Sequence, residues 1–485
     1  MKLMYVNGRF VASESGETMD ILNPATEEVI EQVPNGNEAD AHKAIAAAKA
    51  AFEEWRWLPG LERAAMLHEA ARKIHHHYDE IAQLMTLEGG KPIPESEEGI
   101  EWTIGTLDYY AEMARTYRGR LLAPADRQQF NFVMKEPFGV VACIIPFNFP
   151  LLLMAWKVAP ALAAGNTVII KPADSTPLAT LRLAEIAFDH FPPGVVNVLT
   201  GEGARVAEPM VKHPDVPLIA FTGSTAVGKR IAMLAAERVK RTHLELGGKD
   251  AFVVAPDADV ETAVEAVAYA ALLNTGQVCT ATERVYVPEH LFNSFTGGLV
   301  DYVSSLRIGP GSESTTDLGP MTAAKYRAKV EDHVADAVKS GARVLTGGKR
   351  PSQFNRGFYY EPTVLVNVNH NMRCMREETF GPTIPVMAYK SFDEAITLVN
   401  DSDYGLGACI RTNDPQLAKR FFEEVQAGTI WINDPLTDNY GGPFGGFKMS
   451  GNARELGEEG LESFLETKHV HWDFDDKPKE WWYPY

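Results

Sequence analysis

A cysteine and a glutamate are the two residues whose types and surroundings point most directly to chemistry. Cys279 lies between a glycine-containing turn and the apolar run Val285-Tyr-Val287, and Glu245 precedes two glycines that let backbone approach a ligand closely. A thiolate can attack an electrophilic carbon, and a carboxylate can take a proton from water. A lone cysteine is more often a small buried hydrophobe. The pair therefore suggests thiol covalent catalysis, and the prediction depends on support from other motifs in the chain.

A further signal lies where an apolar strand gives way to a helix. Phe221-Thr-Gly-Ser-Thr-Ala-Val-Gly228 ends a strand and opens a helix, whose free amides and positive dipole end favour a phosphate. The glycine spacing followed by Lys229 nearly matches a P-loop, but Arg230 stands where that loop needs a magnesium-binding hydroxyl. The pattern disfavours an NTPase and leaves a dinucleotide pyrophosphate as the ligand.

Two more motifs follow predicted strands, at the edge where doubly wound sheets bind ligands. Lys171-Pro-Ala-Asp174 could hold ribose hydroxyls, or it could form a solvated ion pair at a loop. In Pro146-Phe-Asn-Phe-Pro150, two prolines flank Asn148, whose amide could donate to a developing oxyanion. Asparagine is also a common turn residue. From these residues alone, both alternatives stay open at each motif.

The elements that must position these residues alternate between short apolar runs and helical patterns. The first half predicts strands at 132–134, 139–145, 167–170, 195–199 and 218–221, with helices at 39–55, 61–87, 95–117, 151–164, 177–188, 203–213 and 225–238. The second half predicts strands at 251–254, 284–287, 343–345, 384–387 and 428–432, with helices at 260–273, 291–306, 323–340 and 392–400. This alternation predicts two α/β domains, each with a parallel sheet covered on both faces.

Composition and charge exclude several classes of partner. A net charge of −19 disfavours nucleic acid and anionic lipid. Four widely separated cysteines give neither a zinc pattern nor a disulfide framework, and the start of the chain lacks a signal-peptide core, so we expect a reducing cytoplasm and no metal. The apolar stretch 139–165 is interrupted by Pro146, Pro150 and Pro160, which predicts buried structure rather than a membrane span. The run His75-His-His77 falls in a predicted helix and is expected to be a solvated face.

These separate signals fall into one family pattern. Over almost its whole length the chain resembles the NAD(P)-dependent aldehyde dehydrogenase superfamily. The matching stretches, in family order, are Pro146-Phe-Asn-Phe-Pro150, Lys171-Pro-Ala-Asp174, Phe221-Thr-Gly-Ser-Thr225, Glu245-Leu-Gly-Gly248, Gly276-Gln-Val-Cys279, Glu378-Thr-Phe-Gly-Pro382 and Pro443-Phe-Gly-Gly446. The resemblance implies an aldehyde dehydrogenase-like α/β fold, with a Rossmann-like cofactor domain, a catalytic domain and a β oligomerisation arm.

The resemblance also implies a mechanism. Cys279 would attack the aldehyde carbonyl, and Asn148 with the Cys279 backbone amide would stabilise the oxyanion of the thiohemiacetal. Hydride transfer to nicotinamide would leave a thioester, which water activated by Glu245 would hydrolyse to a carboxylic acid. The thiolate is the competent nucleophile, and a nearby nicotinamide cation would favour it. Lys157 and Glu455 match a proton-relay pair of many relatives, although they could equally be surface charges.

Two larger sets of residues follow from the same resemblance. Glu378 matches the residue that holds the nicotinamide ribose, and Phe380 the ring packed near nicotinamide; an ordinary salt bridge and a core aromatic are the alternatives. The expected cofactor residues are Ile145, Pro146, Phe147, Lys171, Asp174, Gly203, Phe221, Gly223, Ser224, Leu246, Gly247, Glu378 and Phe380. The expected substrate tunnel consists of Phe149, Leu153, Trp156, Leu273, Asp438 and Phe444.

Two positions depart from the common family pattern. Asp174 stands where NAD-preferring relatives most often have glutamate; its carboxylate can accept from a ribose diol and repels a 2′-phosphate, so we expect NAD, with NADP still possible. Asp438 breaks an otherwise apolar tunnel at a position that is often aromatic. A polar or cationic aldehyde is therefore one hypothesis for the substrate.

The resemblance divides the chain into three parts. We expect the NAD-binding domain at 1–117 and 138–247, the catalytic domain at 248–449, and the oligomerisation arm and tail at 118–137 and 450–485. The tail ends in Trp481-Trp-Tyr-Pro-Tyr485, and so much apolar surface usually finds a partner. We expect a homodimer or homotetramer whose tail packs on a neighbouring subunit; a cap on its own subunit is the alternative.

Two other functions fit the same family. A CoA-acylating relative would pass the thioester to a thiol, but such relatives generally lack a glutamate at the position of Glu245. A catalytically silent member would be a binding or structural protein. The presence of Cys279, Glu245 and Asn148 together argues against that.

Overall fold

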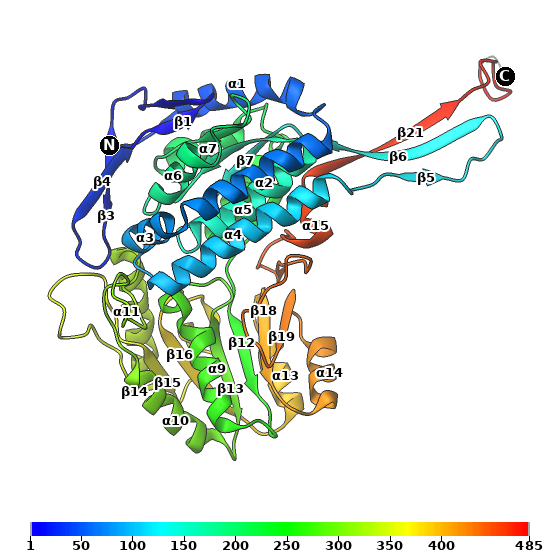
Figure 1. Cartoon of the computed structure of the whole chain (residues 1–485). Helices are drawn as coiled ribbons and strands as arrows, with labels where there is room; N and C mark the ends of the chain where they lie inside the picture. Colours follow the sequence, from blue (N-terminus) through cyan, green and yellow to red (C-terminus); the bar gives the residue numbers. More distant parts are fainter. Residues whose placement is uncertain (1, 484–485) are drawn as a thin grey trace.

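A computed structural model describes residues 2–483, which form two main bodies, each built on a seven-stranded sheet, and a long arm (Figure 1). The first sheet is parallel except for β1, which pairs antiparallel with both of its neighbours. In spatial order its strands are β11 (Arg241–Glu245), β10 (Leu218–Thr222), β7 (Val140–Ile144), β8 (Thr167–Lys171), β9 (Val196–Val198), β1 (Met4–Val6) and β2 (Arg9–Val11).

Both faces of this first sheet are buried, because successive strand residues point to opposite sides. Along β7, Val141 and Cys143 pack into one apolar cluster, while Val140 and Ala142 pack into another. The first face is covered by α5 (Pro150–Ala164) and α6 (Leu178–Ile186), with α2 (Gly60–His76), α3 (Tyr78–Gly89) and α4 (Ile93–Ala114) outside them. The second face is covered by α1 (Glu38–Trp55), α7 (Gly203–Lys212) and α8 (Thr225–Ala236).

The second sheet is parallel except for β14 at one edge. In spatial order its strands are β14 (Arg343–Thr346), β15 (Thr363–Val366), β16 (Thr383–Tyr389), β13 (Thr282–Pro288), β12 (Asp250–Val254), β18 (Gly407–Arg411) and β19 (Thr429–Ile432). Its helices are α9 (Val260–Leu272), the 3-10 turn η1 (Leu273–Gly276), α10 (Phe292–Ser305), α11 (Ala324–Lys339), α12 (Arg373–Arg376), α13 (Phe392–Asn400) and α14 (Pro415–Glu424). Alternation along β12 again buries both faces, with Phe252 in one cluster and Val253 in another.

A three-stranded antiparallel arm reaches away from both bodies (Figure 1). It consists of β5 (Arg120–Leu122), β6 (Gln129–Pro137) and β21 (Leu465–Asp473), and β21 pairs with β6 along its whole length. The smaller elements are the β3 (Thr18–Leu22) and β4 (Val29–Pro34) hairpin, the pair β17 (Tyr404–Gly405) with β20 (Phe447–Lys448), and α15 (Gly457–Glu462). Helix α15 packs on α4 and α5 of the first body.

The α/β fold class predicted from the alternation is confirmed, but the predicted helix at 61–87 is wrong. It is two helices, α2 and α3, because His77 leaves helical geometry at φ −108° and its amide donates back to Ile74 O at 3.0 Å. Amphipathic periodicity continues across a one-residue break, so the sequence pattern does not detect it. The neighbouring side chains of His75 and His76 are exposed, as expected.

Candidate active site

A cavity of about 610 Å³ opens at the carboxyl ends of the central strands of the first sheet. Four neighbouring strands end here. Strand β11 ends at Glu245 and β8 at Lys171, while Gly223 directly follows β10 and Asn148 lies in the loop after β7. Because parallel strands end at one edge, the topology brings these distant segments together. The predicted residues on its wall are Cys279, Glu245, Asn148, Ile145, Pro146, Phe147, Lys171, Asp174, Gly203, Phe221, Gly223, Ser224, Leu246, Gly247, Glu378 and Phe380.

Glu245 ends β11 as a fully buried carboxylate at the wall of this cavity. Within residues 2–483 neither of its oxygens accepts a hydrogen bond that meets ordinary geometry. Burial, followed by the charge of Glu455, raises the pKa of Glu245 well above its usual range, while Lys157 and the nearby Cys279 thiol act in the opposite direction. A carboxylate whose pKa is moved toward neutrality suits a general base.

Cys279 follows an unusual turn at the end of α9. Asn274, Thr275 and Gly276 all have positive φ, at 48°, 57° and 73°. Two contacts hold this strained turn: the Asn274 amide donates to Glu95 at 3.0 Å, and the Thr275 hydroxyl donates to a backbone carbonyl at 2.9 Å. Such strain persists where the surroundings fix it, and here it presents the half-buried Cys279 to the cavity.

The surroundings of Cys279 disfavour its thiolate form. Burial, followed by the charge of Glu245, raises the pKa of the Cys279 thiol well above its usual range. The thiolate is the nucleophilic form. A positive charge in the cavity would act in the opposite direction and favour the thiolate.

Asn148 is held in a fixed orientation beside the nucleophile. Its amide nitrogen donates to Gln277 O at 3.0 Å, two residues before Cys279, and its backbone carbonyl accepts from Lys91 at 2.5 Å. An amide nitrogen carries two hydrogens, so one remains for an oxyanion. Sequence reasoning missed Lys91, although its place after two glycines between two helices was a usable signal.

Lys157 and Glu455 form a fully buried ion pair. Lys157 also donates to Thr222 Oγ1 at 2.5 Å, and Thr222 lines the cavity, so the pair connects with the site through this hydroxyl. His243 lies on the other side, with its Nε2 3.4 Å from Glu455 Oε1. Although burial acts to raise the pKa of Glu455, Lys157 and His243 hold it below its usual range. The alternative of two surface charges is thereby wrong.

The far end of the cavity has the features that a dinucleotide needs. Ser224 caps α8 by accepting from Val227, and Gly223, Ser224 and Val227 at the start of this helix line the cavity. Lys171 and Asp174 are ion-paired on the wall, with Lys171 buried and Asp174 partly exposed. A Cβ added at Gly247 would meet the Glu378 carboxylate at 2.4 Å, so glycine there leaves that carboxylate clear. The residues present therefore fit a dinucleotide cofactor.

Glu378 and Phe380 belong to the loop before β16. Glu378 accepts from the Gly248 amide at 3.2 Å, and burial, followed by the charge of Glu283, raises its pKa to about 7. Phe380 has a positive φ of 59° and packs edge-on against Phe147. Sequence reasoning missed Tyr326, which stacks on Phe147 with ring centroids 4.2 Å apart; nothing local in α11 indicates it.

The six predicted tunnel residues lie outside the wall of this cavity. Leu153, Trp156 and Phe444 are buried in the apolar cluster against which Phe149 and Cys279 pack. The rings of Trp156 and Phe444 are 4.9 Å apart. Leu273 and Asp438 are half-buried. The structure thus brings the thiol between the cofactor cavity and an apolar cluster.

Asp438 adds a charge at this second side. Burial, followed by the charge of Glu98 on α4, raises the pKa of Asp438 to about 7, and Asp438 in turn raises the pKa of Cys279. Trp102 on α4 lies 4.5 Å from Tyr440, close to Asp438 in the chain. Two carboxyl groups, Asp438 and Glu98, therefore interact on the side of Cys279 away from the cofactor cavity.

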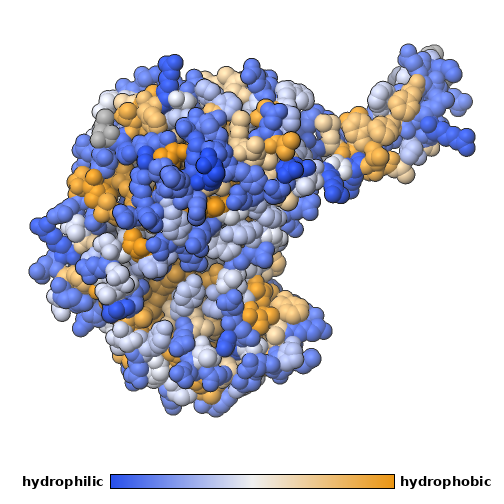
Figure 2. Space-filling model, in the orientation of Figure 1, coloured by the Kyte–Doolittle hydropathy of each residue, from blue (hydrophilic) through white to orange (hydrophobic). Residues whose placement is uncertain are grey.

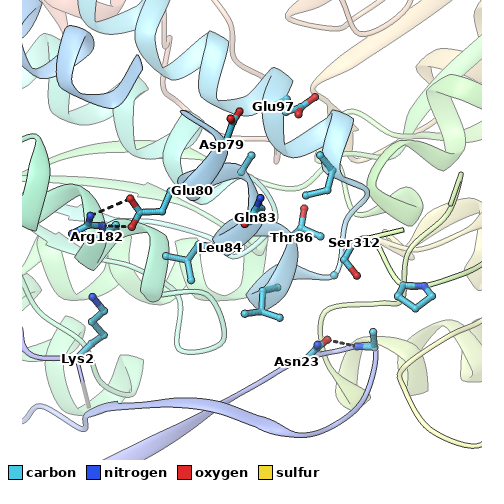
Figure 3. Close-up of a pocket in the computed structure, with 17 residues that line it drawn as sticks. Lys2, Asn23, Asp79, Glu80, Gln83, Leu84, Thr86, Glu97, Arg182 and Ser312 are labelled. Carbon is cyan, nitrogen blue, oxygen red and sulfur yellow. Dashed lines mark hydrogen bonds and ion pairs between the residues drawn. The ribbon is translucent and has the colours of Figure 1, made fainter. Parts of the chain in front are cut away.

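A separate cleft of about 730 Å³ lies beside α3 and the N-terminal strands (Figure 3). Its charged groups are largely paired, as Arg182 with Glu80 and Lys2 with Glu185. It contains none of the predicted site residues.

Across residues 2–483, no helix is long and apolar enough to cross a membrane, and no group of three His, Cys, Asp or Glu side chains has metal-binding placement.

A thiol and a buried carboxylate at one wall of a cofactor cavity define a dehydrogenase that works through a cysteine. The chain belongs to the aldehyde dehydrogenase family, whose sequence profile matches residues 10–470. It is an oxidoreductase that oxidises an aldehyde with reduction of NAD(P).

Known proteins resemble it along nearly its full length. It is 39% identical to betaine aldehyde dehydrogenase of Bacillus subtilis over 473 residues, covering 96% of each chain. It is 38% identical to the peroxisomal aminoaldehyde dehydrogenase 2 of Pisum sativum over 490 residues, covering 99% of this chain and 97% of that one. The crystal structure of betaine aldehyde dehydrogenase from Staphylococcus aureus with NAD+ superposes with a TM-score of 0.98 at 37% identity, covering 99% and 96%.

Proposed function

We propose that this enzyme oxidises an aldehyde bearing an amino or quaternary ammonium group to the corresponding acid, with NAD as acceptor. The observation that carries the substrate class is Asp438, a half-buried carboxylate close enough to Cys279 to raise the pKa of its thiol. Glu98 adds a second negative charge near Asp438. Relatives named for betaine aldehyde and aminoaldehydes support the same class.

The proposed chemistry begins at Cys279. Glu245 takes the thiol proton of Cys279, the thiolate sulfur forms a bond to the aldehyde carbon, and the carbonyl electron pair moves to oxygen. The amide of Asn148, already oriented by Gln277, donates to that oxyanion together with the Cys279 backbone amide. When bound, NAD supplies the acceptor for the hydride that leaves the same carbon and a cationic ring that favours the thiolate. The product on the enzyme is a thioester of Cys279.

Glu245 completes the proposed cycle. Its carboxylate takes a proton from water, whose oxygen attacks the thioester carbon; the carbon–sulfur bond breaks and Cys279 leaves as thiolate. The unpartnered state of Glu245 among the described residues and its raised pKa support this role. We propose that Lys157 and Glu455 pass the proton onward by way of Thr222.

We propose NAD rather than NADP as the preferred acceptor. Asp174 puts a carboxylate at the end of the cavity, where it accepts from ribose hydroxyls and repels a phosphate. Its ion pair with Lys171 leaves oxygen lone pairs for those hydroxyls. Gly223, Ser224 and the first turn of α8 would hold the pyrophosphate.

The test of the proposed function is a comparison of aldehydes. Betaine aldehyde and an aminoaldehyde are assayed against a neutral isostere in which a tert-butyl group replaces the trimethylammonium group, and NADH formation is followed. We expect a higher kcat/KM for the cationic aldehydes. Equal or higher kcat/KM for the neutral isostere would refute the substrate class and leave aldehyde oxidation in place.

We propose that the arm joins copies of this chain into a dimer or tetramer in the cytoplasm. Its exposed apolar side chains include Leu121, Trp472 and Phe474, at 70%, 56% and 56% exposure, and Figure 2 shows apolar surface along it. The tail continues from the arm, and its last two residues lie outside the described part. Light scattering at micromolar concentration should give a multiple of 53.4 kDa; a monomer would contradict the proposal. We also propose that residues 1–117 and 138–247 form the NAD-binding domain, residues 248–449 the catalytic domain, and residues 118–137 and 450–485 the arm and tail.

A further inference from the structure

A buried ion pair between Lys249 and Glu283 joins three segments of the active site. Lys249 lies four residues after Glu245, and Glu283 lies four residues after Cys279. The side chains are 0% and 4% exposed. The mechanism described above uses neither residue, although both stand between the proposed base and nucleophile and the loop that carries Glu378.

Glu283 makes two further contacts that are directed at this loop. One carboxylate oxygen accepts from the Thr379 amide at 2.7 Å, and the other accepts from the Phe380 amide at 2.7 Å. Lys249 also donates to the Thr379 hydroxyl at 3.4 Å. Two consecutive amides on one carboxylate fix the direction of the backbone between them. This backbone includes Phe380 at its positive φ of 59°.

Stability alone does not account for this arrangement. Burying two charges costs free energy that their attraction barely offsets, and apolar residues of similar size are often as good. Although burial acts to raise the pKa of Glu283, Lys249 and the two amides hold it below its usual range, so the carboxylate stays charged. A charged acceptor is what holds a strained loop most firmly.

We propose that Glu283, kept charged by Lys249, is a positioning residue for the cofactor: it holds the loop so that Glu378 and Phe380 face the cavity beside Gly247. The inference rests on the proposed cofactor roles of Glu378 and Phe380. It adds that one side chain, Glu283, joins the segment after the nucleophile to two consecutive amides of the cofactor-binding loop. The substrate class does not enter this argument.

The test uses the full-length enzyme with Glu283→Gln and the double variant Lys249→Met/Glu283→Gln. Each oxygen of Glu283 accepts one backbone amide, and glutamine replaces one of these oxygens by an NH2 group, so one of the two amides loses its acceptor and the loop is held less firmly. The double variant removes the unpaired buried charge, so it regains thermal stability if the single variant loses it. If Glu283 contributes only to stability, the double variant should bind NAD like the wild type. If Glu283 positions the loop, the double variant should still bind NAD weakly.

A matched control is Glu88→Gln. Glu88 is also a buried carboxyl group that accepts from two consecutive amides, those of Leu178 at 2.7 Å and Ala179 at 2.9 Å, and it lies outside the cavity wall. Because burial raises the pKa of Glu88 to about 8, it is a control for the hydrogen bonds and not for the charge. Its substitution shows how the loss of a hydrogen bond from a buried carboxyl group to a backbone amide affects the enzyme when that bond lies away from the cofactor cavity. We expect its NAD affinity to match that of the wild type.

Two measurements decide the proposal. Hydrogen exchange of the Thr379 and Phe380 amides, without any cofactor, should become faster by about tenfold or more in both Glu283 variants. The dissociation constant for NAD, from protein fluorescence, should rise about tenfold in both, while kcat at saturating NAD changes less than about threefold. Wild-type exchange and wild-type NAD affinity in the double variant would overturn it.

The proposed roles of the loop residues are tested separately with Glu378→Gln. If that variant binds NAD as well as the wild type, the cofactor role of Glu378 fails, and the exchange rates still show whether Glu283 holds the loop. If Glu378→Gln weakens NAD binding and Glu283→Gln does not, the inference about Glu283 fails on its own.

Discussion

Replacing Asp438 by asparagine should remove the preference for cationic aldehydes and its dependence on pH. In the wild type, burial raises the pKa of Asp438 from 3.8 to about 7. Above pH 7 the group is charged and attracts a cation; below pH 7 it is protonated and neutral. The preference should therefore fall as the pH falls through 7. An asparagine side chain in its place has the same size and no charge at any pH.

The size of the effect follows from Coulomb's law. A carboxylate and an ammonium group about 6 Å apart, at an effective dielectric constant of about 20, attract by roughly 3 kcal/mol. The cost of taking the cation out of water offsets about half of this, which leaves about 1.4 kcal/mol, or tenfold in kcat/KM. At pH 6 about one tenth of Asp438 stays ionised, so the preference should shrink to about twofold.

The assay measures kcat/KM for betaine aldehyde divided by that for its tert-butyl isostere, at pH 6 and pH 8. Ionisation of Cys279 and Glu245 affects both aldehydes alike, so the ratio isolates the charge at Asp438. Glu98→Gln is the partner variant, because the charge of Glu98 raises the pKa of Asp438. A ratio that keeps its pH dependence in Asp438→Asn would refute the reasoning.

Four further outcomes follow from the proposed site. Cys279→Ser should abolish NADH formation while NAD affinity stays within about twofold; measurable turnover would exclude the thiol mechanism. Glu245→Gln should release about one NADH per subunit and then stall, with an acyl group on Cys279 by intact mass; steady turnover would show another base. Asn148→Ala should lower kcat by about 10²–10³, and an unchanged kcat would remove its oxyanion role. Asp174→Ala should improve kcat/KM for NADP relative to NAD by about tenfold, tested with both cofactors at fixed aldehyde; no change would leave the NAD preference unexplained.

Local patterns indicated the parts of the site that lie at strand ends. Asn148, Lys171 and Gly223 each follow an apolar run, and parallel topology alone brings such ends to one edge. The family resemblance supplied further residues of the cavity wall, including Glu378 and Phe380. Both lie on that wall in the structure, while their roles stay predictions until the variants are measured.

Other features depend on pairs of residues far apart in the chain, which a single sequence does not reveal. The bond from Lys91 to Asn148 and the stacking of Tyr326 on Phe147 join elements of different bodies or layers. The pair of Lys249 and Glu283 is of the same kind. Nor does periodicity report the break at His77, because both helices present their apolar faces in phase.

The assembly of the active site from two separate sheets has a consequence for refolding from denaturant. Glu245 and Asn148 come from the carboxyl edge of one sheet, whereas Cys279 and Glu378 precede strands of the other. Neither half possesses a complete reaction centre, so catalysis must await their docking. During refolding, the far-ultraviolet circular dichroism signal should recover before enzymatic turnover does. The lag between the two would measure the rate at which the two halves dock.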